Sequence, residues 1–145
     1  MKKIIVINGP NLNLLGERQP EVYGKTTLPE LERRLKKCGK SLGYQIDCFQ
    51  FNSEGDIVDC VQKYRKGVAG IVMNPAGYSH TSIVILDALL AVEVPVVEVH
   101  ISNIYKREEF RRRSITAAGC AGLISGLGIT GYELAIQYIA NTAKG

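Results

Sequence analysis

Hydrophobic and polar residues follow two alternating patterns along the chain. Short apolar runs with little polar alternation predict buried β-strands, and apolar residues three or four positions apart predict amphipathic helices. The expected strands cover residues 3–7, 44–49, 68–73, 94–99 and 122–124. The expected helices cover residues 28–42, 53–66, 81–92, 106–113 and 130–141, and the fourth of these is short and strongly charged.

Local signals mark the ends of two of these helices. Thr27 and Glu30 have the spacing of a capping box before the first helix, and Gly43 is expected to end that helix. Thr130 and Glu133 repeat the capping-box spacing before the last helix.

The order of the elements predicts the fold class. Strands that alternate with single helices predict a parallel sheet with helices on both faces, and the apolar character of the strands agrees with burial on both sides. Five strands predict a flavodoxin-like, doubly wound α/β fold with the sheet order 2-1-3-4-5. The 145 residues contain no linker, repeat or low-complexity stretch, so we expect one domain over residues 1–145.

Composition and charge narrow the function classes. The chain is 46% hydrophobic and 22% charged, which is typical of a soluble globular protein. No apolar run reaches the ~18 residues of a membrane-spanning helix, and the N-terminal run is too short for a signal peptide. We therefore expect a cytoplasmic protein without a membrane partner. The net charge of +4 permits an anionic substrate but is weak evidence for nucleic-acid binding.

The metal-ligating residue types are sparse. The chain has two histidines and four cysteines, the latter without C-x-x-C spacing: Cys38, Cys48, Cys60 and Cys120. Without a secretory signal, such cysteines are more typical of small buried hydrophobes than of disulfides or zinc ligands. We therefore expect no metal site built from the protein alone.

Polar residues gather where the expected strands end. Ligands of open parallel sheets bind beyond the carboxyl ends of the strands. Residues 8–13 follow the first strand, residues 74–80 follow the third, and residues 100–103 follow the fourth. Ordinary loop chemistry explains the asparagines in these segments. It explains His80 and His100 less well, which favours a functional site at this edge.

Glu98 and His100 lie two residues apart in the fourth expected strand, so their side chains share one face. A carboxylate beside an imidazole favours the imidazolium and orients the ring, which suits a general acid. An unpaired carboxylate in so apolar a strand would be costly, which favours a partner for Glu98 over a plain edge position.

The connection between the first strand and the first helix is unusually long. It has about 19 residues where ~2–6 are usual, and long connections are often lids. The expected lid covers residues 17–25, carries Arg18 and Tyr23, and has Gly16 and Gly24 as flexible points. An arginine near a tyrosine stabilises the phenolate. From spacing alone, however, a surface tyrosine stacked on an arginine is the favoured interpretation.

Two further motifs have ordinary explanations. Residues 106–113 form a charged run, which is usually a solvated helix face, although Arg107 and Arg111 share a face there and could reach a carboxylate. Residues 126–131 match G-x-G-x-x-G, but no strand and no ribose-binding acid follow, which favours a tight turn. The helix that follows could still help to bind an anion.

Four blocks of the chain resemble the type II 3-dehydroquinase family. The first runs from Val6 to Arg18 and continues with Tyr23 and Gly24. The others cover residues 74–82, residues 98–103 with 107–111, and residues 126–132. The blocks occur in the family's order and cover essentially the whole chain. The resemblance implies anti elimination of water from 3-dehydroquinate, through an enolate, to give 3-dehydroshikimate without metal, cofactor or Schiff base. It also implies a homo-oligomer, usually a dodecamer of four trimers.

The resemblance assigns the catalytic roles. Tyr23 is the base that removes the C2 proton as a phenolate, and Arg18 favours that phenolate. Asn11 helps to stabilise the enolate through a water. His100 protonates the departing hydroxyl, and Glu98 orients His100.

The resemblance also assigns the residues that bind the substrate. Its hydroxyls are held by three side chains: Asn74, His80 and Arg111. The backbone N–H groups of Ile101 and Ser102 bind its carboxylate, and Asp87 reaches into a neighbouring subunit's site. Leu86 departs from the family pattern, which commonly has arginine at that position.

Two other functions stay open from the residues. One is a nucleotide- or flavin-binding flavodoxin-like module, which rests on the fold class and on residues 126–131. The other is a nucleic-acid binder that uses residues 106–113, although the two acidic residues within that run count against it. A dehydroquinase of this type would serve either aromatic biosynthesis through the shikimate pathway or the breakdown of quinate.

Overall fold

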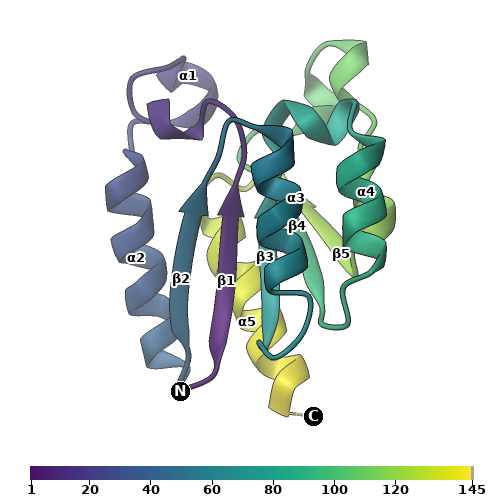
Figure 1. Cartoon of the computed structure of the whole chain (residues 1–145). Helices are drawn as coiled ribbons and strands as arrows, with labels where there is room; N and C mark the ends of the chain where they lie inside the picture. The colour runs from purple at the N-terminus through teal and green to yellow at the C-terminus, as the bar shows by residue number, and fades with distance from the viewer. Residues whose placement is uncertain (145) are drawn as a thin grey trace.

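A computed structural model describes residues 1–144 and contains one five-stranded parallel sheet in the order β2-β1-β3-β4-β5 (Figure 1). The strands are β1 (Lys3–Asn8), β2 (Gln45–Gln50), β3 (Gly70–Asn74), β4 (Val96–His100) and β5 (Gly122–Ser125). The doubly wound, flavodoxin-like α/β fold predicted from the sequence is thereby confirmed.

Helices cover both faces of this sheet (Figure 1). One face packs against α2 (Leu28–Ser41) and α5 (Thr130–Lys144), and the other packs against α3 (Glu54–Lys63) and α4 (Ile83–Leu90). The two-residue period of β1 divides its side chains between the two cores. Ile4 and Val6 join the first core, whereas Ile5 and Ile7 join the second.

Burial follows position in the sheet. β3 and β4 are buried along their whole length, because each has a strand on both sides and helices above and below. The edge strands β2 and β5 are mostly half-buried. Burial on both faces explains why the sequences of these two strands are mostly apolar.

Capping residues set the starts of the helices. The Thr27 hydroxyl accepts from the Glu30 backbone N–H, so Thr27 is confirmed as the N-cap of α2, and the same hydroxyl donates to the Glu30 carboxylate. Gly43 follows the end of α2 with a φ of 89°, a left-handed conformation that favours glycine. Thr130 is the first residue of α5 rather than the residue before it, so its expected role as an N-cap is wrong.

The charged run over residues 106–113 is not one helix. It contains the end of one short 3₁₀ turn, η3 (Ile104–Lys106), and a second, η4 (Glu109–Arg111), separated by extended backbone at Arg107. The run has one large apolar residue, Phe110, which is 68% exposed. Without an apolar stripe to pack against the body, an amphipathic helix has little to stabilise it. The prediction that Arg107 and Arg111 share a helix face is therefore wrong.

The long connection after β1 has structure of its own. It contains a 3₁₀ turn, η1 (Leu12–Leu14), and a one-turn helix, α1 (Pro20–Tyr23). Gly16 lies between these two elements and Gly24 directly follows α1, with φ of 88° and 84°. Within residues 1–144, no helix combines the length and the apolar character needed to cross a membrane.

The four cysteines are free thiols, and three of them have strongly shifted pKa values. Burial raises the pKa of Cys48 and of Cys120 to about 12, and that of Cys60 to about 11. Burial also raises the pKa of Tyr132, which is fully buried, above its ordinary value of 10.0. These groups are neutral in the folded chain at neutral pH, as buried hydrophobic positions require.

These raised pKa values predict that stability falls in alkali. The unfolded thiols ionise above about pH 9 while the folded thiols keep their protons, so the full stability is present below that pH and is lost as the pH rises. Urea unfolding of the reduced protein should show a lower midpoint at about pH 10 than at about pH 7. A variant with Cys48→Ala and Cys120→Ala should show a smaller decrease. Equal midpoints at both pH values would contradict the prediction.

Candidate active site

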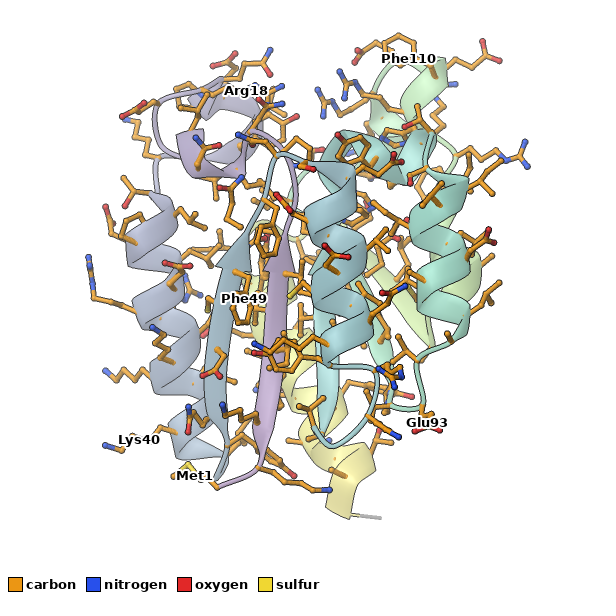
Figure 2. All side chains as sticks on the ribbon, viewed as in Figure 1. Met1, Arg18, Lys40, Phe49, Glu93 and Phe110 are labelled. Atoms are coloured by element: carbon orange, nitrogen blue, oxygen red, sulfur yellow. The ribbon has the colours of Figure 1, made fainter. Side chains whose placement is uncertain are left out.

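A cavity of about 200 Å³ opens at the carboxyl ends of β1, β3 and β4. Arg18 stands at the end of the molecule towards which the strands point, whereas Lys40 and Glu93 lie towards the opposite end (Figure 2). The lining residues come from the connections that follow the three strands: Pro10, Asn11, Leu12, Arg18, Tyr23, Asn74, Ala76, Gly77, His80, His100, Ile101, Ser102, Ile104, Arg107 and Arg111. The edge that the sequence pattern indicated is therefore the edge that carries a cavity.

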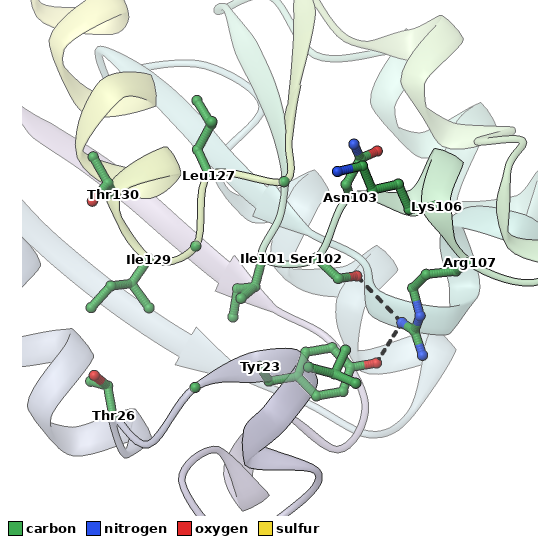
Figure 3. Close-up of a pocket in the computed structure, with 14 residues that line it drawn as sticks. Tyr23, Thr26, Ile101, Ser102, Asn103, Lys106, Arg107, Leu127, Ile129 and Thr130 are labelled. Carbon is green, nitrogen blue, oxygen red and sulfur yellow. Dashed lines mark hydrogen bonds between the residues drawn. The ribbon is translucent and has the colours of Figure 1, made fainter.

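Tyr23 and Arg107 meet across this cavity. An Arg107 guanidinium nitrogen, Nη1, donates to the Tyr23 hydroxyl at 2.7 Å and lies 3.3 Å from the Ser102 hydroxyl (Figure 3). The Arg18 guanidinium carbon lies 5.0 Å from the centre of the Tyr23 ring. The Arg107 guanidinium carbon also lies close to the ring, 5.3 Å from its centre, so both arginines contact the ring and Arg107 in addition binds the oxygen. The bond from Arg107 is charge-assisted, because its donor is a guanidinium group.

Glu98 and His100 form a buried pair at the end of β4. Their side chains share one face, as the two-residue spacing predicted, and His100 Nε2 lies 2.7 Å from Glu98 Oε2. Glu98 is fully buried and His100 is 6% exposed. His100 lines the cavity and Glu98 lies behind it, so the carboxylate orients the ring without facing the cavity.

Asn74 is held by a chain of buried hydrogen bonds. Its side-chain amide donates to the Tyr132 hydroxyl at 2.8 Å, and that hydroxyl donates to the Asn8 side-chain oxygen at 2.7 Å. The Asn74 side-chain oxygen accepts from the Ala76 backbone N–H at 3.0 Å. Because both ends of the amide have fixed partners, Asn74 presents one orientation to the cavity.

His80 lies in η2 (Ala76–His80), the turn that follows β3. Its Nδ1 lies 2.8 Å from the Arg113 carbonyl oxygen. A carbonyl only accepts, so Nδ1 carries a proton. The ring centres of His80 and His100 are 6.3 Å apart, and the two rings are inclined by 25°.

The glycine-rich turn over residues 126–131 supports the end of β4. Gly126 and Gly128 have φ of 91° and 61°, and their N–H groups donate to the carbonyls of His100 and Ile101. A Cβ atom on Gly126 would lie 2.7 Å from Asn103 Cβ, so a side chain does not fit there. The turn borders an open hollow of about 620 Å³ that also reaches Tyr23 and Arg107 (Figure 3). This geometry agrees with the tight turn expected from the sequence.

The cavity wall combines a phenol, two imidazoles and three guanidinium groups. Such a set can bind an anion and move protons to and from carbon and oxygen. Over residues 1–144, no three or more His, Cys, Asp or Glu side chains are grouped so that they could hold a metal ion.

The chain matches a known family over nearly its whole length. The model of the family described as Dehydroquinase class II matches residues 2–140. The chain belongs to the class II dehydroquinase family. It is 52% identical over 141 residues to the 3-dehydroquinate dehydratase of Clostridium botulinum (strain Hall), covering 97% of this chain and 96% of that one. The 3-dehydroquinate dehydratase of Cereibacter sphaeroides is 50% identical over 142 residues, which cover 98% and 97% of the two chains.

The solved structures agree with this class II dehydroquinase membership. The crystal structure of the type II dehydroquinase from Propionibacterium acnes superimposes with a TM-score of 0.93 at 44% identity, covering 97% of each chain. The class of enzyme, a hydro-lyase, is thereby confirmed. The alternative of a nucleotide- or flavin-binding module is not favoured.

Within this class II dehydroquinase, two of the predicted site residues do not line the cavity. Glu98 lies behind His100, as described above. Asp87 lies on the exposed face of α4 beside Ile83, Val84 and Leu90, which are 56–64% exposed. The structure therefore keeps Asp87 away from the cavity of its own chain.

Sequence reasoning missed several contacts of this site. It assigned Arg107 no contact with Tyr23, which is 84 positions away in the chain. It did not single out Ser114 or Thr116, whose hydroxyls both bind Glu98. The demand of a buried carboxylate for donors was visible in the sequence, but it did not indicate which hydroxyls would supply them.

Proposed function

We propose that the cavity dehydrates 3-dehydroquinate to 3-dehydroshikimate, with Tyr23 as base and His100 as acid. The observation that carries this proposal is that one small cavity holds both groups, each with its own charged partner. Arg107 binds the Tyr23 oxygen at 2.7 Å, and Glu98 binds the His100 ring at 2.7 Å. An elimination needs one group that takes a proton and another that gives one. A guanidinium partner favours the negative phenolate at Tyr23, and a carboxylate partner favours the positive imidazolium at His100.

The first step removes a proton from the carbon beside the ketone of the substrate. Tyr23 acts as the phenolate, which Arg107 stabilises through the hydrogen bond and Arg18 through its position over the ring. The developing enolate needs a hydrogen-bond donor. Asn11 has a φ of 71° and a side chain at the cavity wall, and it supplies this donor through a water.

The second step expels the hydroxyl group. Since the Glu98 carboxylate binds Nε2 of His100, the other ring nitrogen, Nδ1, is left to protonate the departing oxygen. The base comes from the connection after β1 and the acid from the end of β4. Two groups from separate elements suit an anti elimination, in which the proton and the hydroxyl leave from opposite faces of the ring.

The substrate is held by the remaining residues of the cavity. The backbone N–H groups of Ile101 and Ser102 bind its carboxylate. Asn74, His80 and Arg111 bind its hydroxyls, and all three line the cavity. The three arginines give the cavity a positive charge that suits an anion.

The segment over residues 17–25 acts as a lid. It carries Arg18 and Tyr23, and its ends at Gly16 and Gly24 have left-handed backbone. A Cβ atom on Gly16 would lie 2.9 Å from the Lys25 carbonyl oxygen, so this end requires glycine. The bond between Tyr23 and Arg107 joins the lid to the segment after β4 and closes it over the substrate.

The working enzyme is a cytoplasmic homo-oligomer, a dodecamer of four trimers, in the shikimate pathway. Support for an assembly comes from α4, whose exposed face carries Ile83, Val84 and Leu90 around Asp87. Exposed apolar residues gathered on one helix face are typical of an interface. In the assembly, Asp87 reaches the cavity of a neighbouring subunit.

The base is tested by Tyr23→Phe. Conversion of dehydroquinate is followed by the absorbance of the conjugated enone product, and the variant should lose at least about 10²-fold in kcat because no phenolate can form. Its near-ultraviolet circular dichroism should match that of the wild type. Conversion at the wild-type rate would show that Tyr23 is not the base, and no absorbance rise with the wild-type enzyme would overturn the reaction itself.

Arg107 is tested by Arg107→Gln, with Lys106→Gln as the matched control. Loss of the cation disfavours the Tyr23 phenolate, so the pH at which kcat levels off should rise by about 1–3 units. At neutral pH the variant should therefore be slow, and it should regain activity in alkali. Lys106 is exposed and, unlike Arg107, makes no hydrogen bond to Tyr23, so the control should keep the wild-type profile. An unchanged profile for Arg107→Gln contradicts the role.

The contribution of a neighbouring subunit is tested by mixing two inactive variants. Asp87→Ala and Tyr23→Phe should each lose activity, and sedimentation should show that both keep the wild-type assembly. Subunits unfolded and refolded together should regain part of the activity, because some sites then combine an intact Tyr23 with an intact Asp87. Full activity of Asp87→Ala alone, or a wild-type protein that sediments as a 15.9 kDa monomer, argues against a shared site.

A further inference from the structure

The buried Glu98 carboxylate has three hydrogen-bond partners, of which two belong to a segment that the proposed reaction does not use. Oε2 accepts from His100 at 2.7 Å and from the Ser114 hydroxyl at 2.5 Å. Oε1 accepts from the Thr116 hydroxyl, and Thr116 is fully buried. The two hydroxyls stand on residues 114 and 116, and both reach the same carboxylate.

The directions of these bonds follow from which groups can donate. An ionised carboxylate only accepts, so both hydroxyls donate to Glu98, and the Ser114 oxygen in turn accepts from the Ala117 N–H at 3.1 Å. The two hydroxyl oxygens also lie 3.3 Å from each other. Three donors around one carboxylate suit its ionised form, which accepts and does not donate. An ionised Glu98 requires the proton on Nε2 of His100 and leaves Nδ1 for the substrate.

The same segment also holds the other histidine, but through its backbone. The Arg113 carbonyl accepts from His80 Nδ1 at 2.8 Å, and the Ile115 N–H donates to the Ser79 carbonyl at 2.6 Å. Residues 113–116 therefore contact η2 through main-chain atoms and Glu98 through side-chain atoms. They run behind both imidazole rings, whose centres are 6.3 Å apart.

We propose that residues 113–116 form a positioning strap for the two histidines, in which Ser114 and Thr116 set the orientation and charge state of His100 through Glu98. The proposal rests on the proposed function of His100 as the acid. Ser114 and Thr116 are positioning residues, since neither lines the cavity. The division between side-chain and backbone contacts has a consequence: loss of a hydroxyl disturbs His100 and leaves the hold on His80 intact.

The effect on His100 has a defined sign. When a donor is removed, the negative charge of Glu98 is shared with fewer partners, and its attraction for the imidazolium grows. The titration midpoint of His100 then moves to higher pH. The variants keep the other titratable or charged groups around the pair, so the comparison with the wild type isolates the lost hydroxyl. These groups are Arg18, Tyr23, His80, Arg107 and Arg111 at the cavity and Cys120 beside Glu98.

The first experiment compares Thr116→Val with Thr116→Ser in the dehydroquinate assay. Valine has the shape of threonine without its hydroxyl, and serine keeps the hydroxyl. We expect kcat of Thr116→Val to fall about 10- to 10²-fold, because a small misplacement of a catalytic group lowers the rate by this much. KM should stay within about threefold of the wild type. Thr116→Ser should stay close to the wild type. A stable Thr116→Val protein with wild-type kcat would overturn the proposal.

The second experiment needs no turnover, so it separates this proposal from the proposed function. The chain has two histidines, and nitrogen-15 labelling of histidine gives one set of ring signals for each. In Thr116→Val the His100 midpoint should rise, and the His80 midpoint should not move. Equal shifts of both histidines, or a shift of neither, would overturn the division of roles within the strap.

Ser114→Ala keeps the proposal testable if Thr116→Val fails to fold. Ser114 is half-buried, so the loss of its oxygen is better tolerated than a change at the fully buried Thr116. It should shift His100 in the same direction and lower kcat with little change in KM. A loss of thermal stability with kcat and the His100 midpoint unchanged would show a purely structural role and overturn the proposal.

Discussion

The buried Glu98 carboxylate is the constraint around which the site is organised. A carboxylate inside an apolar sheet is tolerated when hydrogen-bond donors surround it. Here the donors come from β4 itself and from residues 114 and 116, so the chain must return beneath β4 after η4. That return path brings η5 (Thr116–Gly119) against α4 and brings the Arg113 carbonyl to His80. One buried charge thus links the orientation of His100 to the position of His80.

The second organising contact joins two segments that are remote in the sequence. The Tyr23 hydroxyl reaches the Arg107 guanidinium, and this bond draws the connection after β1 over the end of β4. Arg18 covers the ring from its own side of the cavity. The cations that favour the phenolate are therefore the same groups that would attract an anionic substrate. A chain with a net charge of only +4 thus places three guanidinium groups at one cavity, and the Glu108 carboxylate pairs with one of them, Arg111, at 3.0 Å.

Further contacts outside the cavity fix the positions of His100 and Asn74. The turn at Gly126 and Gly128 binds the carbonyls of His100 and Ile101, and this fixes the end of the strand from which the acid projects. The hydroxyl of Tyr132, buried and protonated, ties Asn74 to the end of β1. His100, Asn74 and His80 are thus each held by a partner outside the cavity, an arrangement that keeps a site ordered before substrate arrives.

The sequence by itself determined the sheet, its order and the edge that carries the site, because strands buried on both faces and capped helices leave strong periodic patterns. It also determined the pairing of Glu98 with His100, since two residues two apart in a strand share a face. Family resemblance named most of the residues around the cavity. The sequence pattern was less informative over residues 106–113, where the spacing of charges suggested a helix that no apolar stripe stabilises.

Only the tertiary structure decided which distant groups meet. The contacts of Tyr23 with Arg107, and of Glu98 with Ser114 and Thr116, join positions separated by 84, 16 and 18 residues. These contacts depend on how three connections fold over one edge of the sheet, and sequence periodicity does not predict the path of a connection. The exposed place of Asp87 on α4 likewise emerged only from the packed chain. Local periodicity indicates whether a residue faces the core or the solvent, whereas the chemistry of this site depends on which residues of distant segments contact each other.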